Sequence, residues 1–523
     1  MNLRLMGIET EYAAVATTQD GMPAPPPDVA GGLYGAARAG LRYLVDDIER
    51  GIFLENGARF YIDHGFHPEF STPECDNPWD IVRYVKAGDR ILLDLAERFG
   101  QGWPKVKEIR VLRHNVDYSG TGSTWGCHES YLYRGEQRVI GENIIPHLVT
   151  RIIYAGAGGF NSRSPGIEFV LSPRVPHMRH VVSADSTRSR GIFHTKNESL
   201  CKSGYKRLHL LCSESVHSER AVWLRVGTTA LIVALAEAGL RPGEQVRLRS
   251  PLRSMRALTL DRSCQQKLAL ASGARVTPIA VQRHYLEQVE AYRRHVGLPL
   301  WAEAVCESWR ESLDRLERDP FELARVLDWP AKWLLFHQHA KKRGFSWDEI
   351  ERWNRLVKRL SLPVAPSVGR SREAPRMPPT IGRAGSESGG GELLPHFARY
   401  RLARERLDPF LRLRQELFEI DTRFGELGDR GLFAGLERAG VLAHRVVESE
   451  EVTRAMVKPP ARGRARVRGE LVAKLAGTGT HHCSWSSVRD GAARMMVDLS
   501  DPFTEEARWE AIPVEKLRFP FSF

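Results

Sequence analysis

The sequence has few of the features that mark membrane, secreted or disulfide-stapled proteins. Its 523 residues contain no apolar run of about eighteen residues or more, so no transmembrane helix is expected. The N-terminus lacks the long apolar core and small-residue cleavage site of a signal peptide. The cysteines number seven, an odd count, and show no CxxC spacing, which argues against a disulfide framework or a structural zinc site. These absences predict a cytoplasmic protein with reduced, mostly structural cysteines.

The sequence also lacks an excess of acidic residues. It contains 76 Lys and Arg but only 64 Asp and Glu, which gives a net charge of +12. A basic surplus favours acidic partners such as nucleic acids, acidic proteins or phosphorylated ligands. No helix-turn-helix, zinc-finger or RNP pattern accompanies the charge, so specific nucleic-acid binding is not expected. With 42% hydrophobic and 27% charged residues, the composition is that of a soluble globular protein, and the length favours more than one domain.

What is present is a dense group of reactive side chains between Asn56 and Phe70. Asn56-Gly57 is a turn signal, and the strand-like run after it places Tyr61 and Asp63 on one face. The chain then continues through His64, His67 and Glu69. A phenol, two carboxylates and two imidazoles so close together suit a convergent site. An edge strand with a solvated polar face is an equally good interpretation of this stretch alone.

A second acidic stretch lies near the N-terminus. Gly7–Tyr12 is typical of a strand with Glu9 and Glu11 on one face. Buried carboxylates about 7 Å apart repel each other unless a divalent cation or an arginine neutralises them. Oxygen ligands of this kind suit Mg²⁺ bound together with phosphates. The alternative is an exposed edge strand, on which acidic residues are common.

The remaining sequence alternates strand and helix patterns. Residues 78–99 predict an amphipathic helix with the apolar stripe Ile81, Val85, Ile91, Leu92 and Leu95. Residues 127–132 predict a strand on which His128 and Glu129 face opposite sides, and residues 205–211 a strand with Arg207 and His209 on one face. Further helices are expected over residues 29–49, 219–239, 276–295, 299–317, 320–342, 347–360 and 396–418.

Residues 361–394 interrupt this pattern. Pro, Ser, Gly and Arg dominate the segment and no apolar period is present, which predicts a flexible insertion or linker. The predicted organisation is a large first domain over residues 1–360 and the insertion over 361–394. A helical continuation of the first domain follows over 395–430, and a small C-terminal domain over 431–523.

Taken together, Met6–Glu11 and Asn56–Glu69, continued by Ser71–Cys75, resemble the family of Pup ligases and Pup deamidases (depupylases). This is the proteasome accessory factor A type of the glutamine-synthetase-like superfamily. The resemblance covers roughly residues 4–360 and 410–505, and it extends to Gly126–Glu129, Thr187–Arg190, Tyr205–His209 and Arg464–Glu470. It implies an α+β fold in which a curved, mainly antiparallel sheet cradles ATP and is backed by packed helices. A small C-terminal domain would complete the nucleotide site.

The resemblance also implies roles for individual residues. Asp63 matches the family's essential aspartate, and the positions for Mg²⁺ and ATP are Glu9, Tyr61 and Glu69. Nucleotide contacts are implied for Arg188, Arg207, Trp485 and the tail arginines Arg466 or Arg468. Supporting positions are Glu11, His67, Asn115, His128 and Glu198. The implied cofactors are ATP and Mg²⁺, and the implied partners are an acidic Pup-like modifier and lysine-bearing target proteins, with the proteasome system indirectly involved.

The two branches of this family catalyse opposite reactions. Deamidases carry a long extra loop after the first strand, and Tyr12–Asn56 is too short to contain it. This favours a ligase that joins the modifier's C-terminal Glu side chain to a lysine through an acyl-phosphate. Asp63-His64 and Asp328–Lys332 resemble the deamidase branch, so hydrolysis of Gln or isopeptide bonds is the alternative. A small-molecule carboxylate–amine ligase and an inactive paralogue are two further hypotheses.

The sequence departs from the family pattern in one segment near these motifs. Residues 194–200 read His-Thr-Lys-Asn-Glu-Ser-Leu, where both branches usually have Asn-Thr-Arg-Asp-Glu-Pro-His. His114 also stands where the family usually has Asn. The loss of an arginine fork and a histidine is expected to alter contacts with phosphate or carboxylate groups.

Overall fold

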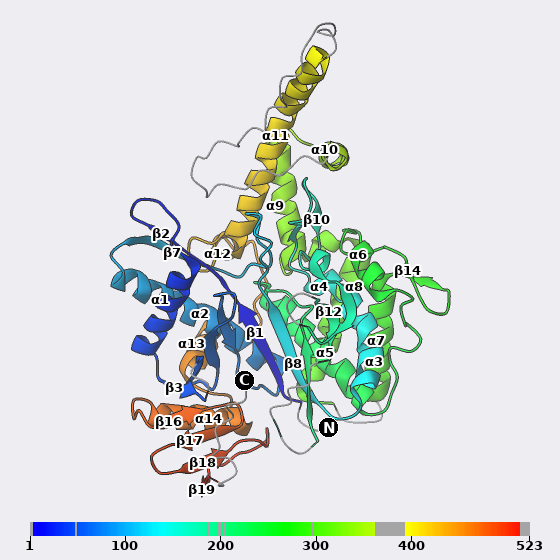
Figure 1. Ribbon diagram of the computed structural model, residues 1–523. Coiled ribbons are helices and arrows are strands. Elements are labelled where there is room, and N and C mark those ends of the chain that lie inside the picture. Colours follow the sequence, from blue (N-terminus) through cyan, green and yellow to red (C-terminus); the bar gives the residue numbers. More distant parts are fainter. Residues whose placement is uncertain are drawn as a thin grey trace, which may run out of the picture.

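The computed structural model describes residues 4–47, 50–185, 189–195, 201, 204–293, 298–360 and 393–512, the side chains of 359–360 and 393–406 excepted. Its main element is an 11-stranded sheet (Figure 1). In order across the sheet, the strands are β13 (Lys206–Leu210), β8 (Cys127–Tyr133), β1 (Met6–Glu11), β6 (Pro68–Ser71), β5 (Arg59–Ile62), β4 (Gly51–Leu54), β3 (Tyr43–Asp46), β16 (His481–Cys483), β17 (Ser487–Asp490), β18 (Met495–Asp498) and β19 (Trp509–Ala511). The neighbours β3 and β16 are parallel, and the other pairs are antiparallel.

Helices and four smaller strand pairs supply the rest of the described fold, which confirms the predicted α+β class with a mainly antiparallel sheet. They are α1 (Pro26–Gly40), α2 (Pro78–Gly102), α3 (Gln137–Thr150), α4 (Ile152–Ala155), α5 (Glu219–Glu237), α6 (Pro251–Leu258), α7 (Pro278–Arg293), α8 (Leu300–Arg318), α9 (Asp328–Lys342), α10 (Trp347–Leu360), α11 (Leu393–Gly425), α12 (Leu432–Arg438), α13 (Ser449–Val457) and α14 (Gly463–Leu475). Smaller strand pairs are β2 (Ala13–Thr18) with β7 (Val106–Leu112), β9 (Gly159–Phe160) with β10 (Phe169–Val170), β11 (His180–Ser183) with β12 (Gly191–His194), and β14 (Leu268–Ala269) with β15 (Arg275–Val276).

One face of the main sheet is apolar and packs against helices. Ile8 of β1 and Tyr131 of β8 join a buried cluster with side chains of α2, α3 and α5. Phe60 of β5 and Phe70 of β6 join a second cluster with side chains of α1 and α2. Because side chains alternate along a strand, the residues between these positions face the other way. These helices therefore cover the apolar face of the central strands, and the polar side chains lie on the opposite face, where the site described below is found.

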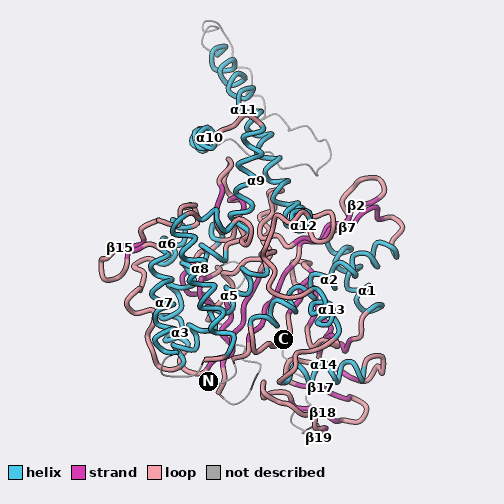
Figure 2. The backbone as a smooth tube through the Cα atoms, turned by 180° about the vertical axis from the view of Figure 1, so that it is seen from behind, coloured by secondary structure: helices cyan, strands magenta, loops and turns pink. Residues whose placement is uncertain are grey.

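The C-terminal segment packs on that opposite face, at one end of the sheet. Phe53 of β4 clusters with Val467 and Leu471 of α14, whereas its neighbours Ile52 and Leu54 belong to the cluster behind the sheet. Figures 1 and 2 show α14 and β17–β19 together at one end of the molecule. The strands of this segment continue the main sheet through the β3–β16 pair. The predicted domain boundaries stay a prediction.

Two expectations about local structure are wrong. The helix expected over 29–49 ends at Gly40, because Leu41 takes an extended conformation (φ −112°, ψ 157°), and the alternating residues 43–46 form β3. The helix expected over 320–342 is divided into a short 3-10 turn (Pro320–Leu323) and α9, because Leu327 is extended between them (φ −123°, ψ 147°).

Five further helix predictions are confirmed. The helices expected at 78–99, 219–239, 276–295, 299–317 and 347–360 are present as α2, α5, α7, α8 and α10. The insertion was predicted over 361–394, and its residues 361–392 lie outside the described residues. The helix α11 begins at Leu393. All seven cysteines are free thiols. Within the described part of the chain, none of the helices combines the length and apolar character that a bilayer crossing requires.

Candidate active site

The register of three neighbouring strands brings the two acidic stretches together. Glu11 on β1 is the cross-strand partner of Glu69 on β6, and Glu69 is in turn the partner of Tyr61 on β5. Cross-strand partners lie on the same face of a sheet. Glu9 shares this face, because Glu9 and Glu11 alternate with the buried Ile8 of the opposite face. The four predicted metal-site and supporting residues of these strands thus form one acidic cluster, Glu9, Glu11, Tyr61 and Glu69.

Glu69 is the member of the acidic cluster that most needs a neutralising partner. It is 5% exposed, and burial together with the neighbouring Glu9 and Glu11 carboxylates raises the pKa of its carboxyl well above the usual range. Ligand atoms of Glu11, Glu69 and His128 lie within 4.8 Å of one another. Carboxylate oxygens at this separation suit a hard divalent cation such as Mg²⁺, whose charge would allow Glu69 to ionise. The donor set therefore fits a metal ion.

Basic side chains from β8 and β13 surround Glu9. Arg207 donates a hydrogen bond from Nη2 to Glu9 Oε1 at 2.5 Å. Nδ1 of His128 lies 3.4 Å from Glu9 Oε2, and Nε2 of His209 lies 3.9 Å from the same oxygen. Burial alone would raise the pKa of Glu9, but Arg207 and His209 hold that pKa well below its usual range. The predicted residues Arg207 and His128 are thus both in the site.

His209 is a site residue that the sequence analysis did not single out. Its signal was present, because the alternation over 205–211 had already placed His209 on the same face as Arg207. Glu129, in contrast, faces away from the site, which confirms that His128 and Glu129 lie on opposite sides of the strand. It is 0% exposed and lies 2.9 Å from Arg151 and 3.0 Å from Arg225. Glu129 therefore belongs to the packing between β8 and the helices.

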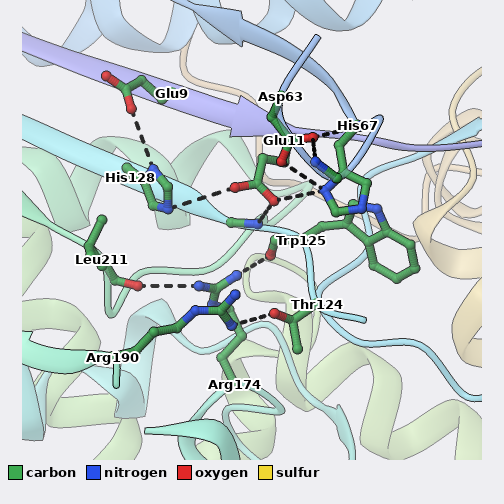
Figure 3. A network of polar contacts seen from close by, with 12 residues as sticks. Glu9, Glu11, Asp63, His67, Thr124, Trp125, His128, Arg174, Arg190 and Leu211 are labelled. Carbon is green, nitrogen blue, oxygen red and sulfur yellow. Dashed lines mark hydrogen bonds and ion pairs between the residues drawn. The ribbon is translucent and has the colours of Figure 1, made fainter. Parts of the chain in front are cut away.

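Asp63 lies in a tight turn at the end of β5 (Figure 3). Its Oδ1 accepts hydrogen bonds from the backbone N–H groups of Gly65 and His67, both at 2.7 Å. Nδ1 of His67 lies 3.2 Å from Asp63 Oδ2 and 3.3 Å from Glu11 Oε2. Although burial lowers the pKa of His67, the hydrogen bonds to Asp63 and Glu11 raise it to about 9. Asp63 and His67 therefore form one unit that borders the acidic cluster.

The loop 124–126 connects this cluster to two arginines (Figure 3). The N–H of Gly126 donates to Glu11 Oε2 at 2.8 Å. Arg174 donates to a carbonyl of the same loop, and Arg190 to its threonine hydroxyl. Arg190 belongs to the basic segment that the sequence analysis quoted, whereas nothing in the sequence around Arg174 pointed to the site. The two guanidinium groups add positive charge beside the acids.

A cavity lies beside Glu9, toward the N-terminal end of β1. Its walls come from the central strands, the segment after β6 and the C-terminal segment. The lining residues are Leu5, Met6, Gly7, Ile8, Glu9, Ser71, Thr72, Glu74, Ser130, Tyr131, Leu132, Arg207, Arg464, Trp485 and Pro502. The predicted nucleotide contacts Arg207 and Trp485 therefore both line this cavity.

The tail arginines of α14 face different ways. Arg464 lines the cavity and donates to Glu74 at 2.6 Å. Arg468 is 0% exposed, pairs with Glu74 and donates to the carbonyl of Gly57 at 2.9 Å. Arg466 instead pairs with Glu470 (3.0 Å) and Glu505 (3.1 Å). Among the tail positions, the cavity wall thus contains Arg464 rather than Arg466, and Arg468 lies behind it.

Gly57 explains why α14 can lie so close to the β4–β5 turn. Its φ is +81°, and a Cβ there would lie 2.8 Å from the backbone oxygen of Ala465. Both observations require glycine at this position. The Asn56-Gly57 turn signal is therefore confirmed, and the turn also seats the C-terminal segment.

Three remaining predicted site residues lie elsewhere or outside the described residues. Asn115 is buried and exchanges two hydrogen bonds of 2.8 Å with the backbone of Ser215. It joins the segment after β7 to the segment before α5. Arg188 and Glu198 lie outside the described residues, as does most of the divergent segment 194–200.

Comparisons with known proteins agree with this geometry. A family model described as "Pup-ligase protein" matches residues 4–357 and 401–489. The Pup–protein ligase of Acidimicrobium ferrooxidans is 30% identical over 522 residues, 96% of this chain and 96% of the relative. That of Nakamurella multipartita is 30% identical over 512 residues, 96% of this chain and 97% of the relative.

Two solved structures share the fold. The complex between the prokaryotic ubiquitin-like protein Pup and its ligase PafA has a TM-score of 0.72 at 23% identity, covering 96% of this chain and 90% of that chain. The Pup ligase PafA in complex with ADP has a TM-score of 0.65 at 23% identity, covering 92% of this chain and 91% of that chain.

Proposed function

Because this chain belongs to the Pup ligase family, we propose that it is an ATP-dependent ligase that attaches a Pup-like modifier to lysine side chains of proteins. The bond formed is an isopeptide bond to the side chain of the modifier's C-terminal Glu. The relatives that match nearly the whole chain are named as ligases, which favours ligation over the hydrolytic alternative. The net charge of +12 suits an acidic modifier.

One observation carries this proposal: the Asp63 turn and the cavity meet the same acidic cluster from opposite ends of β1. His67 of the turn contacts Glu11 at the C-terminal end of the strand. The cavity is lined by residues 5–9 at the N-terminal end. A nucleotide held at one end and a proton acceptor at the other leave the reacting groups between them. This is the arrangement that a carboxylate–amine ligase requires.

The reaction divides into two displacements. In the first, an oxygen of the modifier's γ-carboxylate attacks the γ-phosphorus of ATP, and ADP leaves as the acyl phosphate forms. In the second, the lysine nitrogen attacks the acyl carbon, a C–N bond forms, the C–O bond to phosphate breaks and inorganic phosphate leaves. The lysine ammonium must lose one proton before it attacks, and Asp63 accepts it. The second proton leaves the nitrogen with the phosphate.

Residues of the acidic cluster would hold the divalent cation. Glu9, Tyr61 and Glu69 are assigned to Mg²⁺, with Glu11 beside them, and the ion would neutralise charge on the phosphates when bound. Arg207 reaches the boundary between cluster and cavity, where phosphate oxygens of a nucleotide would lie. Trp485 and Arg464 are assigned to the nucleotide side of the cavity. Arg468 is assigned to their support, because it lies 4.8 Å from the Trp485 ring.

The cellular setting and the domain plan belong to the same proposal. Free thiols at all seven cysteines fit a reducing, cytoplasmic compartment. Attachment of a Pup-like modifier would mark proteins for the proteasome system. Residues 1–360 and 395–430 would form the catalytic domain, with 431–523 completing the nucleotide site.

The test is a reconstituted ligation read by intact mass. The purified chain is incubated with Mg²⁺-ATP, a Pup-like protein ending in Glu and a lysine-rich acceptor protein. The expected product is a conjugate with the mass of both proteins minus one water, which requires ATP and is lost in Asp63→Asn. A preformed conjugate and a Gln-ended modifier are offered in parallel. Cleavage or deamidation without ATP-dependent conjugation would replace the ligase proposal with the hydrolytic one.

A further inference from the structure

Phe66 is an exposed aromatic residue in the turn that carries Asp63. It is 50% exposed, so about half of its surface is open to solvent. Its φ is +60°, and it is one of three non-glycine residues in the described chain with positive φ. A bulky residue is strained in this region of backbone conformation, where glycine or asparagine fits more easily. Neither burial nor backbone preference explains a phenylalanine at this position.

The turn holds Phe66 in this conformation. Its N–H donates to the carbonyl of Asp63 at 3.2 Å, and the N–H of Asp63 donates to the carbonyl of His67 at 3.0 Å. A Cβ at Gly65 would lie 2.9 Å from the imidazole of His67, so the turn is tightly closed. Strain that is held by surrounding contacts beside a reacting group is a mark of a functional position.

Geometry indicates which substrate would meet this ring. The cavity assigned to the nucleotide is lined by residues 5–9 of β1, and the turn contacts Glu11 at the other end of that strand. The side chain of Asp63 is 23% exposed, so part of the proposed proton acceptor is open to solvent. A lysine that gives its proton to Asp63 must reach this exposed part of the turn, on which Phe66 is also exposed.

The chemistry of lysine fits an aromatic ring at this place. Its four-carbon stem is apolar and packs on apolar surface while its charged end stays in polar surroundings. Its ammonium group is also attracted to the face of an aromatic ring. We propose that Phe66 contacts the stem of the acceptor lysine and positions its nitrogen toward Asp63. This inference rests on the proposed ligase function.

Hydroxylamine provides the experiment that separates the inference from the function. It attacks acyl phosphates and yields a hydroxamate, but it has no stem for a ring to contact. Wild type, Phe66→Ala, Phe66→Tyr and Phe66→Gly are compared with Mg²⁺-ATP and a Pup-like protein ending in Glu. The nucleophile is either hydroxylamine or a lysine-rich protein, and the products are read by intact mass.

The expected result is a selective loss. Phe66→Ala should lower kcat/KM for the lysine acceptor by about tenfold, the scale of one lost aromatic contact, while hydroxamate forms at the wild-type rate. Phe66→Tyr should restore lysine use, because it keeps the ring. Phe66→Gly should resemble Phe66→Ala, although it removes the backbone strain. Arg494→Gly, at φ +54° outside the site, is the control for strain relief and should ligate like wild type.

Several outcomes would overturn the inference. Equal loss of hydroxamate and conjugate in Phe66→Ala would make the ring a structural part of the turn. If Phe66→Ala used lysine at the wild-type rate, the ring would make no contact with the acceptor. If the variant raised only the KM for the modifier, the ring would contact the modifier and not the lysine. If the wild-type chain forms neither hydroxamate nor conjugate, the proposed function fails and the inference falls with it.

Discussion

Asp63 and His67 are joined twice within one turn. Asp63 Oδ1 accepts the backbone N–H of His67 at 2.7 Å, and Asp63 Oδ2 lies 3.2 Å from Nδ1 of the His67 ring. The carboxylate therefore both shapes the turn and presents the group proposed to accept the lysine proton. Any substitution of Asp63 changes the turn as well as the chemistry, and the two effects need a matched control.

Asp63→Asn should slow ligation by about 10²–10⁴-fold, the usual contribution of a general base. An amide cannot accept the proton from the lysine ammonium. ADP binding, measured by calorimetry, should stay within about twofold of wild type, because the cavity lies at the other end of β1.

Asp117→Asn is the matched control for turn geometry. Asp117 accepts from the N–H groups of Ser119 at 2.9 Å and Thr121 at 3.0 Å, as Asp63 does in its own turn. Its substitution should leave the ligation rate near the wild-type value. A loss as large as that of Asp63→Asn would show that turn geometry, rather than proton transfer, explains the Asp63 result.

Binding of Mg²⁺ should release protons from the acidic cluster. Burial and the charges of Glu9 and Glu11 raise the pKa of Glu69, so below that raised pKa the metal-free site retains a proton that the cation must displace. Apparent affinity for Mg²⁺ should therefore rise with pH until the pH exceeds the pKa of the metal-free carboxyl. A pH-indicator dye in weakly buffered solution measures the release.

Glu69→Gln should abolish this proton release, whereas Glu470→Gln should not change it. Glu470 has a side chain that is 56% exposed and pairs with Arg466 away from the cluster. Proton release that persists unchanged in Glu69→Gln would assign the titrating group to another residue and remove Glu69 from the proposed metal site.

The buried pair of Glu74 and Arg468 should make stability depend on acid. Burial opposes ionisation of Glu74, but Arg468 and Arg464 lower its pKa from 4.5 to about 2. A lowered carboxyl pKa means that the stabilisation is complete above pH 4.5 and is lost as the pH falls toward 2. Glu74→Gln should cost about 3–5 kcal/mol at neutral pH, the range for breaking a buried ion pair.

Denaturant unfolding between pH 3 and pH 7 measures this effect. The difference in unfolding free energy between wild type and Glu74→Gln should shrink as the pH falls. Glu470→Gln removes an exposed pair and should cost about 0–1 kcal/mol at every pH. A constant difference between wild type and Glu74→Gln across this range would contradict the assignment.

Local periodicity predicted the elements that depend on it. The apolar stripe from Ile81 to Leu95 predicted α2 because its spacing follows one helix face. Alternation predicted the faces of Glu9 and Glu11 on β1, and of Arg207 and His209 on β13. These predictions depend only on the spacing of residues that are near one another in the sequence.

Such local patterns do not predict which strands pair when the strands are far apart in the sequence. Glu11 lies opposite Glu69 because β1 inserts between β6 and β8, and no local signal specifies that neighbour. The parallel pairing of β3 with β16 joins segments more than four hundred residues apart. For the site, the family resemblance supplied what periodicity lacked.

The implied nucleotide role of Arg466 or Arg468 stays a prediction, and a helix assignment would have added to it. Arg464 and Arg468 are four residues apart and therefore share a helix face, whereas Arg466 lies on another. The segment was quoted as a motif without an assigned helix, so the shared face was not used. Arg174 is different, because its position depends on how residues 171–175 pack beneath the loop 124–126.

Gly126 gives the last prediction, since it tests the geometry of the cluster without removing a charged group. A Cβ at this position would lie 2.5 Å from Nε2 of His128 and 2.7 Å from Oε1 of Glu11. Both atoms are ends of side chains, so Gly126→Ala should fold while it displaces them from their places in the site. A misplacement of about 1 Å costs up to about 100-fold in rate. We therefore expect ligation to fall by about 10- to 100-fold, with weaker Mg²⁺ binding and unchanged thermal unfolding.

Gly435→Ala is the matched control for Gly126→Ala, because nothing lies within 4 Å of the added methyl group and alanine is favoured over glycine in the helix α12. Wild-type ligation by Gly126→Ala would mean that the positions of Glu11 and His128 are not required for the reaction, and the metal assignment would then rest on Glu9, Tyr61 and Glu69 alone.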